Sequence, residues 1–396
     1  FAAYFMQQQL WATIIQVGEA SRKTVKVQTI NLLVAALHFL LIGALFIYDG
    51  LSVAFILALI IAEFAMASLV AWLILRAGTK GQQDERSAPL PFRQMLAKYV
   101  EYCKPLMFLS WIGFLYNFAD TWMLQRFGGA SQQGFYQASF QFSAISLIAT
   151  SSVLNVFWKE IAEANDRGNI ERVAFLYRRM NRGLMMFGSV VSGLLIPWSW
   201  HISIVFLGGS YEMAAPVMMI MFFFPIHASM GQVSGTMFLA SGRTYTYFLI
   251  GAFFMLISIP ISYFIQAPIK GLLIPGLGLG AIGMALKMVL INVVSVNTQA
   301  WYVSRLCKTR YEWAYQVVGI GGIVAIGYLS KTFAGLFWNL NELTNKISLI
   351  LPVAVSAFVY LLLVFVFIWI VPWLAGLERD EIRSGLARIS ALRFRD

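Results

Sequence analysis

Single charged side chains inside long apolar stretches are the groups of this sequence with the clearest chemical potential. Asp120 follows PLMFLSWIGFLY, Glu63 lies in IIAEFAMAS, and Lys287 lies in GAIGMALKMVLINVV. A charge inside hydrocarbon costs about 2.5–3.5 kcal/mol, so such residues usually face a bundle interior or a wet cavity. We expect the three side chains to line a cavity. The alternatives are snorkelling to the outer interface for Lys287, pairing with a nearby base such as Arg126 for Asp120, and helix packing for Glu63.

Neutral amides form a second candidate surface. Gln133, Gln137 and Gln141 recur at every fourth position and fall on one helix face, with Tyr136 and Phe140 beside them. Amides next to aromatic rings suit sugar binding through hydrogen bonds and stacking. Hydrogen bonding between helices is the alternative.

A histidine and a basic cluster complete the candidate groups. His227, in FFFPIHASMGQ, is either a cavity group or a core histidine with satisfied hydrogen bonds. Part of the basic cluster follows from the preference of Lys and Arg for the cytoplasmic side, and one or two of its members are expected to gather anionic headgroups at an entrance. The cluster comprises Lys159, Arg178, Arg179 and Arg182.

Enzyme signatures do not emerge from the sequence. Its three His and two Cys are scattered without metal-ligand spacing. It contains no Gly-rich loop ending in Lys-Ser or Lys-Thr, so ATP hydrolysis by this chain is not expected. We expect no catalytic site, no metal and no cofactor.

The elements that position these groups must be membrane helices. The sequence is 59% hydrophobic and only 12% charged, whereas soluble domains carry about 25% charged residues. About 20 apolar residues span a bilayer core, and its backbone must be hydrogen-bonded internally. The uncharged runs are too long for barrel strands of about 10 residues. We expect an all-α polytopic membrane protein with eleven spans, at roughly 1–18, 26–48, 52–75, 100–125, 132–160, 180–204, 213–240, 244–266, 279–303, 313–332 and 347–374.

The Lys and Arg residues predict the orientation of these spans. Of the 29, 24 fall in one set of alternating loops and four in the other, and Lys287 lies within a span. The rich side is expected to be cytoplasmic, together with the C-terminus. The net charge of +11 then reflects topology and gives no reason to expect nucleic acid.

A short internal repeat predicts two related lobes. EASRKTVKVQTI (19–30) and LASGRTYTYFLI (239–250) align without gaps at an offset of 220. Parallel repeats of this kind are found in transporters. The helices of 1–75 would then be the last three of one lobe, and three earlier helices would be missing from the chain.

Five segments in order resemble a known family: DTWMLQRFGGASQQGFYQAS (120–139), KEIAEANDRGNIERVAFLYRR (159–179), FLGGSYEMAAPVMMIM (206–221), GTMFLASGRTYTY (235–247) and GLGAIGMALK (278–287). The sequence is similar to Wzx-type polysaccharide repeat-unit (O-antigen) flippases, within the multidrug/oligosaccharidyl-lipid/polysaccharide exporter superfamily. Relatives often have Pro where this chain has Trp158-Lys159, so the resemblance does not by itself predict a kink there.

The resemblance implies a two-lobe, MATE-like helix bundle. Its expected parts are half of an N-lobe (1–75), a cytoplasmic linker (76–99), a six-helix C-lobe (100–303), two extra helices (304–376) and a basic amphipathic tail (377–396).

The implied function is flipping of an undecaprenyl-pyrophosphate-linked oligosaccharide across the inner membrane. Lys287 would hold the diphosphate, the glutamines would contact sugar, and Asp120 would keep the cationic wall from trapping its cargo. In that role, Lys287→Glu abolishes transport at unchanged expression. Membrane lipids and polysaccharide polymerase or assembly proteins are the expected partners. The alternatives are a multidrug or cation exporter, a flippase for a lipid-linked peptidoglycan precursor and, more distantly, a membrane polysaccharide polymerase or ligase.

Overall fold

The described part of the chain consists of helices and their connections. The structure is a computed structural model and describes residues 2–20, 23–47, 52–77, 91–270, 274–340 and 346–377. It divides into two compact units, unit 1 (Phe1–Phe92) and unit 2 (Arg93–Asp396). Their boundary lies inside the segment 76–99 that the sequence predicts to be a linker.

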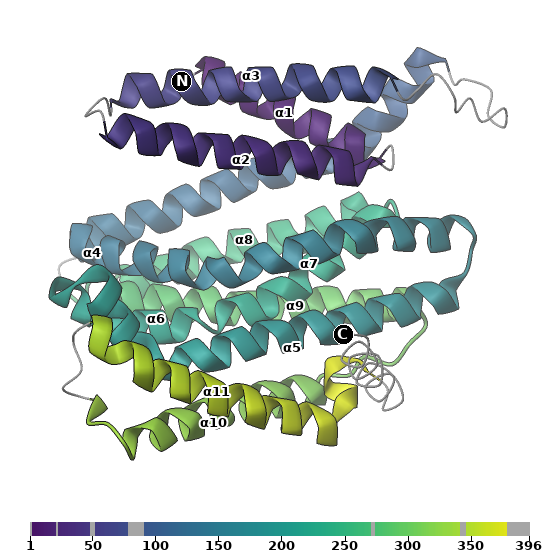
Figure 1. Cartoon of the computed structure of the whole chain (residues 1–396). Coiled ribbons are helices and arrows are strands. Elements are labelled where there is room, and N and C mark those ends of the chain that lie inside the picture. Colours follow the sequence, from purple (N-terminus) through teal and green to yellow (C-terminus); the bar gives the residue numbers. More distant parts are fainter. Residues whose placement is uncertain are drawn as a thin grey trace, which may run out of the picture. The chain divides into compact units, whose positions relative to one another are not determined.

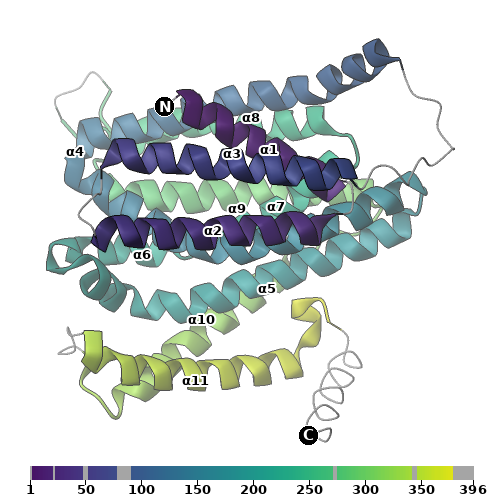
Figure 2. The same ribbon diagram turned by 45° about the horizontal axis from the view of Figure 1, so that its top comes forward.

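Unit 1 is a trio of helices that pack on one another and are drawn in purple to blue in Figures 1 and 2. They are α1 (Ala2–Ala20), α2 (Thr24–Ile47) and α3 (Val53–Ala77). Small residues let the helices approach: Ala67 and Ala71 of α3 are buried together with Trp11 of α1.

Unit 2 begins with α4 (Phe92–Asp166), which is two arms joined at Gly129. Gly129 has φ +80°, in a region that glycine adopts far more readily than residues with a side chain. The arms occupy the positions of the predicted spans 100–125 and 132–160, so the Gly128-Gly129 pair marks the turn between them.

The remaining helices of the predicted C-lobe follow in order. They are α5 (Ile170–Ile202), η1 (Ser203–Leu207), η2 (Gly209–Ala214), α6 (Ala215–Met221), α7 (Phe224–Ala240), α8 (Thr244–Gln266) and α9 (Gly280–Leu306). The segments Gly209–Met221 and Phe224–Ala240 form a broken span that bends by 41°. The bend immediately precedes Pro225, which is tolerated in the first turn of a helix.

Two helices pack on the edge of this bundle: α10 (Ala314–Gly335) and α11 (Lys346–Ile370), followed by the short η4 (Pro372–Ala375). Figures 1 and 2 show α10 and α11 next to each other. Met185, Ile323 and Tyr360 belong to one buried cluster that joins α5, α10 and α11.

The fold is the all-helical membrane bundle that the sequence predicts. Among the described residues, seven helices are long and apolar enough to cross a membrane, or eight with the broken span. Helices also occupy the other predicted spans, which are α1 and the two arms of α4. The predicted amphipathic tail lies almost entirely outside the described residues.

The trio of unit 1 and the trio α7, α8 and α9 share an order of packing. In each, the first and third helices pack most extensively, the second packs on the third, and the first and second contact least. The repeat at an offset of 220 pairs these trios helix by helix. The pseudo-two-fold relation between the lobes remains a prediction.

Candidate functional site

Lys287 and Asp120 form a buried ion pair between α9 and the first arm of α4. Lys287 Nζ contacts Asp120 Oδ2, and the two side chains are 1% and 11% exposed. The ammonium also lies 4.9 Å from the centre of the Tyr116 ring and 3.5 Å from its hydroxyl oxygen. The carboxylate therefore neutralises the cation inside the bundle.

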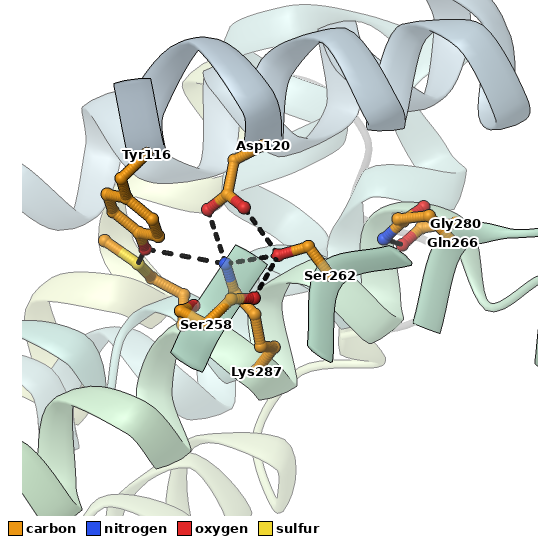
Figure 3. Close-up of polar contacts among 8 residues, drawn as sticks. Tyr116, Asp120, Ser258, Ser262, Gln266, Gly280 and Lys287 are labelled. Atoms are coloured by element: carbon orange, nitrogen blue, oxygen red, sulfur yellow. Dashed lines mark hydrogen bonds and ion pairs between the residues drawn. The ribbon is translucent and has the colours of Figure 1, made fainter. Parts of the chain in front are cut away.

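Ser262 of α8 connects the two charges, as Figure 3 shows. Its hydroxyl accepts a hydrogen bond from Lys287 Nζ at 3.0 Å. It lies 2.5 Å from Asp120 Oδ1 and 2.9 Å from the carbonyl oxygen of Ser258, and it can donate its one proton to either. Oxygen groups from two helices thus surround one ammonium.

The start of α9 positions Lys287. Gly280 has φ +57°, and a Cβ there would lie 2.6 Å from Oε1 of Gln132. That oxygen accepts a hydrogen bond from the Ala281 amide at 2.8 Å, so the second arm of α4 caps α9. Gln266 Nε2 donates to the Gly280 carbonyl at 2.9 Å, which ties the end of α8 to the same point. Lys287 follows two turns later.

The amide stripe is not joined to this pair. Gln137 and Gln141 are exposed in unit 2 and Gln133 is half-buried. Among the hydrogen bonds of the described residues, none involves these three side chains. The adjacent Tyr136 and Phe140 pack against the buried cluster of α6 and α9. The rings therefore belong to the core, and the amides remain available.

His227 lies in a separate polar network. Its Nε2 is 3.2 Å from Oε1 of Gln316 in α10. Gln316 Nε2 donates to Asn297 Oδ1 at 2.8 Å, and Asn297 accepts from the Tyr311 hydroxyl as well. His227 thus links α7, α10 and α9, the arrangement of a histidine with a satisfied hydrogen bond.

Glu63 pairs with His38 inside unit 1. Glu63 Oε2 lies 2.7 Å from His38 Nδ1, and the Glu63 side chain is 3% exposed. Its Oε1 is buried and has no hydrogen-bond partner among the described residues. The pair lines a cavity of about 330 Å³ together with Tyr4, Gln8 and Asn31. The sequence pattern did not place His38 in a site, although it is the direct partner of Glu63.

The basic cluster is divided by the structure. Arg182 contacts Glu312, donates to the Trp373 carbonyl at 3.2 Å and stacks on Tyr315. It therefore connects α5 to the start of α10 and to the segment that follows α11. Arg179 lies over the Phe175 ring, and Arg178 is exposed. The side chain of Lys159 is outside the described set.

Tyr116, Ser258 and Ser262 are the site residues that the sequence did not identify. A signal was present: Tyr116 precedes Asp120 by one turn, and the two serines are one turn apart in a helix without charged residues. Polar residues in membrane helices usually face other helices. In the part of the chain that the structure describes, no group of three or more His, Cys, Asp or Glu could hold a metal ion.

Comparison with known proteins identifies the fold. No protein-family model matches the chain, and no curated protein matches it. An outward-facing multidrug-resistance MATE transporter of the MOP superfamily is similar over 76% of this chain and 69% of its own, with TM-score 0.62 and 14% identity. The crystal structure of a MATE point mutant matches over 74% of this chain and 64% of its own, with TM-score 0.59 and 16% identity. The chain thus spans less than two thirds of the length of that mutant.

A flippase structure is similar over more of the chain. The lipid II flippase MurJ in an inward closed conformation matches over 92% of this chain and 72% of its own, with TM-score 0.56 and 15% identity. At these identities the likeness concerns the fold alone: the chain has a MATE-like fold, which it shares with these transporter and flippase structures.

Proposed function

We propose that this protein is a transporter that flips a lipid-linked oligosaccharide across the cytoplasmic membrane by alternating access. The observation that carries the proposal is the stripe of Gln133, Gln137 and Gln141. Its side chains take part in none of the hydrogen bonds of the described residues. A polar group in hydrocarbon without a partner costs several kcal/mol, so this face of α4 needs water or a polar ligand.

A sugar headgroup has the chemistry that such a face can bind. Its hydroxyl groups donate and accept hydrogen bonds, and a Gln side chain has two N–H donors and one carbonyl acceptor. An organic cation would instead favour a carboxylate. The lipid tail stays in the bilayer while the headgroup follows the amides.

The ion pair of Lys287 and Asp120 fits an anionic linker between lipid and sugar. A phosphate that reached the pair would exchange with Asp120 for the ammonium, and the returning carboxylate would release it. Because Lys287 is buried, this exchange requires α4 to separate from α8 and α9 during the transport cycle.

The structural comparisons support the coarser part of the proposal. The lipid II flippase is similar over 92% of this chain, against 76% for the MATE transporter. The TM-scores have the opposite order, 0.56 and 0.62. We give the coverage more weight because it extends to more of the helices. We also propose that the C-terminus is cytoplasmic and that polysaccharide polymerase or assembly proteins are partners of this protein.

One observation favours a multidrug or cation exporter as the second candidate. Glu63, whose Oε1 has no partner among the described residues, is one of the residues that line a cavity of about 330 Å³ in unit 1, and a buried carboxylate suits a cationic cargo. A peptidoglycan-precursor flippase shares the lipid diphosphate and differs in the sugar.

The glutamine stripe provides the test. Gln137→Leu/Gln141→Leu should reduce export of lipid-linked polysaccharide at least tenfold in a deletion strain, with membrane levels unchanged, because each lost hydrogen bond contributes about 1 kcal/mol. Gln132→Leu is the control for a structural effect of removing an amide from this helix, because Gln132 caps α9. This variant should lower the thermal stability of the purified protein. Normal polysaccharide export by the double variant, together with lost resistance to cationic drugs in Glu63→Gln, would favour the exporter.

A further inference from the structure

Unit 2 has a larger cavity at the end of the bundle that the sequence predicts to face the cytoplasm. Its volume is about 860 Å³, and it lies between the beginning of α4 and the turn from α7 to α8. Three basic side chains line it, Lys98, Lys104 and Arg243, with one acidic side chain, Glu101.

These four charges are not paired with one another in the described part of the chain. All four side chains are exposed. None of them takes part in the ion pairs of the described residues. The three cations exceed the one acid, so the cavity has an excess of positive charge.

The beginning of α8 adds to the positive potential. Arg243 is the N-cap of α8, and no side chain caps the helix there. The first amides of a helix lack partners within it, and the helix dipole favours an anion at this end. Thr244, Tyr245 and Thr246 of this turn line the cavity.

An apolar path leads away from the same cavity. Tyr245, Leu249, Phe253 and Leu256 follow one face of α8 and are 64%, 48%, 59% and 49% exposed in unit 2. Phe108 and Phe248 are part of the cavity wall. An occupant that matches these features has an anionic head and an apolar tail.

We propose that this cavity binds the phosphate headgroup of an anionic phospholipid from the cytoplasmic leaflet, with an acyl chain along the exposed face of α8. Basic groups at this membrane surface attract anionic lipids. No Asn or Gln is among the residues that line the cavity, so it lacks the amides expected for the sugar of the transported lipid. The site is independent of the transport function and would hold α4 and the start of α8 together.

Lipid-dependent stability provides the test. The purified protein in neutral detergent is titrated with phosphatidylglycerol or phosphatidylcholine, and its thermal unfolding midpoint is measured. Phosphatidylglycerol should raise the midpoint and phosphatidylcholine should not, because a ligand that binds only the folded state stabilises it. In Lys98→Gln/Lys104→Gln/Arg243→Gln the apparent affinity for phosphatidylglycerol should fall roughly 100-fold.

Matched variants and probes separate the alternatives. Arg93→Gln, also exposed on the first turn of α4 but outside the cavity wall, should respond as the wild type does. Lys98→Gln/Lys104→Gln leaves the α8 turn unchanged and should show part of the loss. An undiminished phosphatidylglycerol response in the triple variant would overturn the proposal. So would an equal response to inorganic phosphate, or a response only to a polyprenyl diphosphate, which would assign the cavity to the cargo.

Discussion

At the residue scale, the pairing of Lys287 with Asp120 decides what their substitution will do. Removing one partner of a buried ion pair typically destabilises a protein by about 3–5 kcal/mol, because the other charge stays buried and unpaired. The sequence-based expectation for Lys287→Glu, lost transport at unchanged expression, therefore needs correction. That variant would face Asp120 with a second carboxylate, and we now expect its folded level to fall.

A double-mutant cycle separates folding from transport. We expect Lys287→Met and Asp120→Leu each to lower the yield of monodisperse protein, measured by fluorescence-detected size-exclusion chromatography. The double variant should recover much of that yield, because replacing a buried pair by apolar side chains is often neutral.

Transport by the double variant gives the second reading. We expect it to remain absent, since the cation for the phosphate is gone, whereas Lys287→Arg should retain part of the activity. If the double variant restored export along with yield, the pair would only fasten α4 to α9, and our role for Lys287 would be wrong.

The residue types of this pair could be predicted from the sequence, but their pairing could not. Single charges in uncharged segments stand out, because hydrocarbon makes them costly. Asp120 and Lys287 are 167 positions apart, and the local alternative, Arg126, is much nearer in sequence. The choice depends on how α4, α8 and α9 pack, which hydrophobic periodicity does not specify.

At the element scale, the two trios repeat a polar connection as well as an order of packing. His38 and Glu63 connect α2 to α3, and Ser262 and Lys287 connect α8 to α9; each pair is 25 positions apart. At the offset of 220 the second pair lies one helical turn further along. The short sequence match between 19–30 and 239–250 did not reveal this, because the residue types differ.

Close approach of helix backbones fixes α10 against α5. A Cβ at Gly327 would overlap the Gly193 carbonyl oxygen. Small residues permit such crossings in membrane proteins. The sequence predicted α10 as an appended helix, but it does not reveal which of the five glycines of α10 contacts a neighbouring helix.

Alanine substitutions test this crossing. Gly327→Ala should destabilise the protein by roughly 1–3 kcal/mol through overpacking and lower its thermal unfolding midpoint. Gly321→Ala is the matched control one face away, where no atom lies within 4 Å of the new Cβ. It should be neutral or stabilising by up to about 1 kcal/mol, because Ala favours a helix more than Gly does. Equal midpoints for the two variants would contradict the close contact.

At the scale of the whole molecule, lipid is the constraint that made the fold class predictable. A chain with 59% hydrophobic residues and few charges satisfies its backbone in a membrane as helices, and the asymmetry of Lys and Arg predicts their orientation. The depth of each polar group and the partner it contacts depend on tertiary packing, so composition specified the bundle more fully than the site.

Cysteine labelling tests the predicted orientation, on which the cytoplasmic position of the basic cavity depends. Asp166 and Ser210 are exposed near opposite ends of α5. In a Cys103→Ser background, a membrane-impermeant maleimide should label Ser210→Cys in intact cells and Asp166→Cys only after permeabilisation. Cys307 can remain as it is, because burial raises the pKa of its thiol and reduces the reactive thiolate at neutral pH. Reversed labelling would show that the bundle has the opposite orientation, in which the cavity of Lys98, Lys104 and Arg243 faces the outer leaflet.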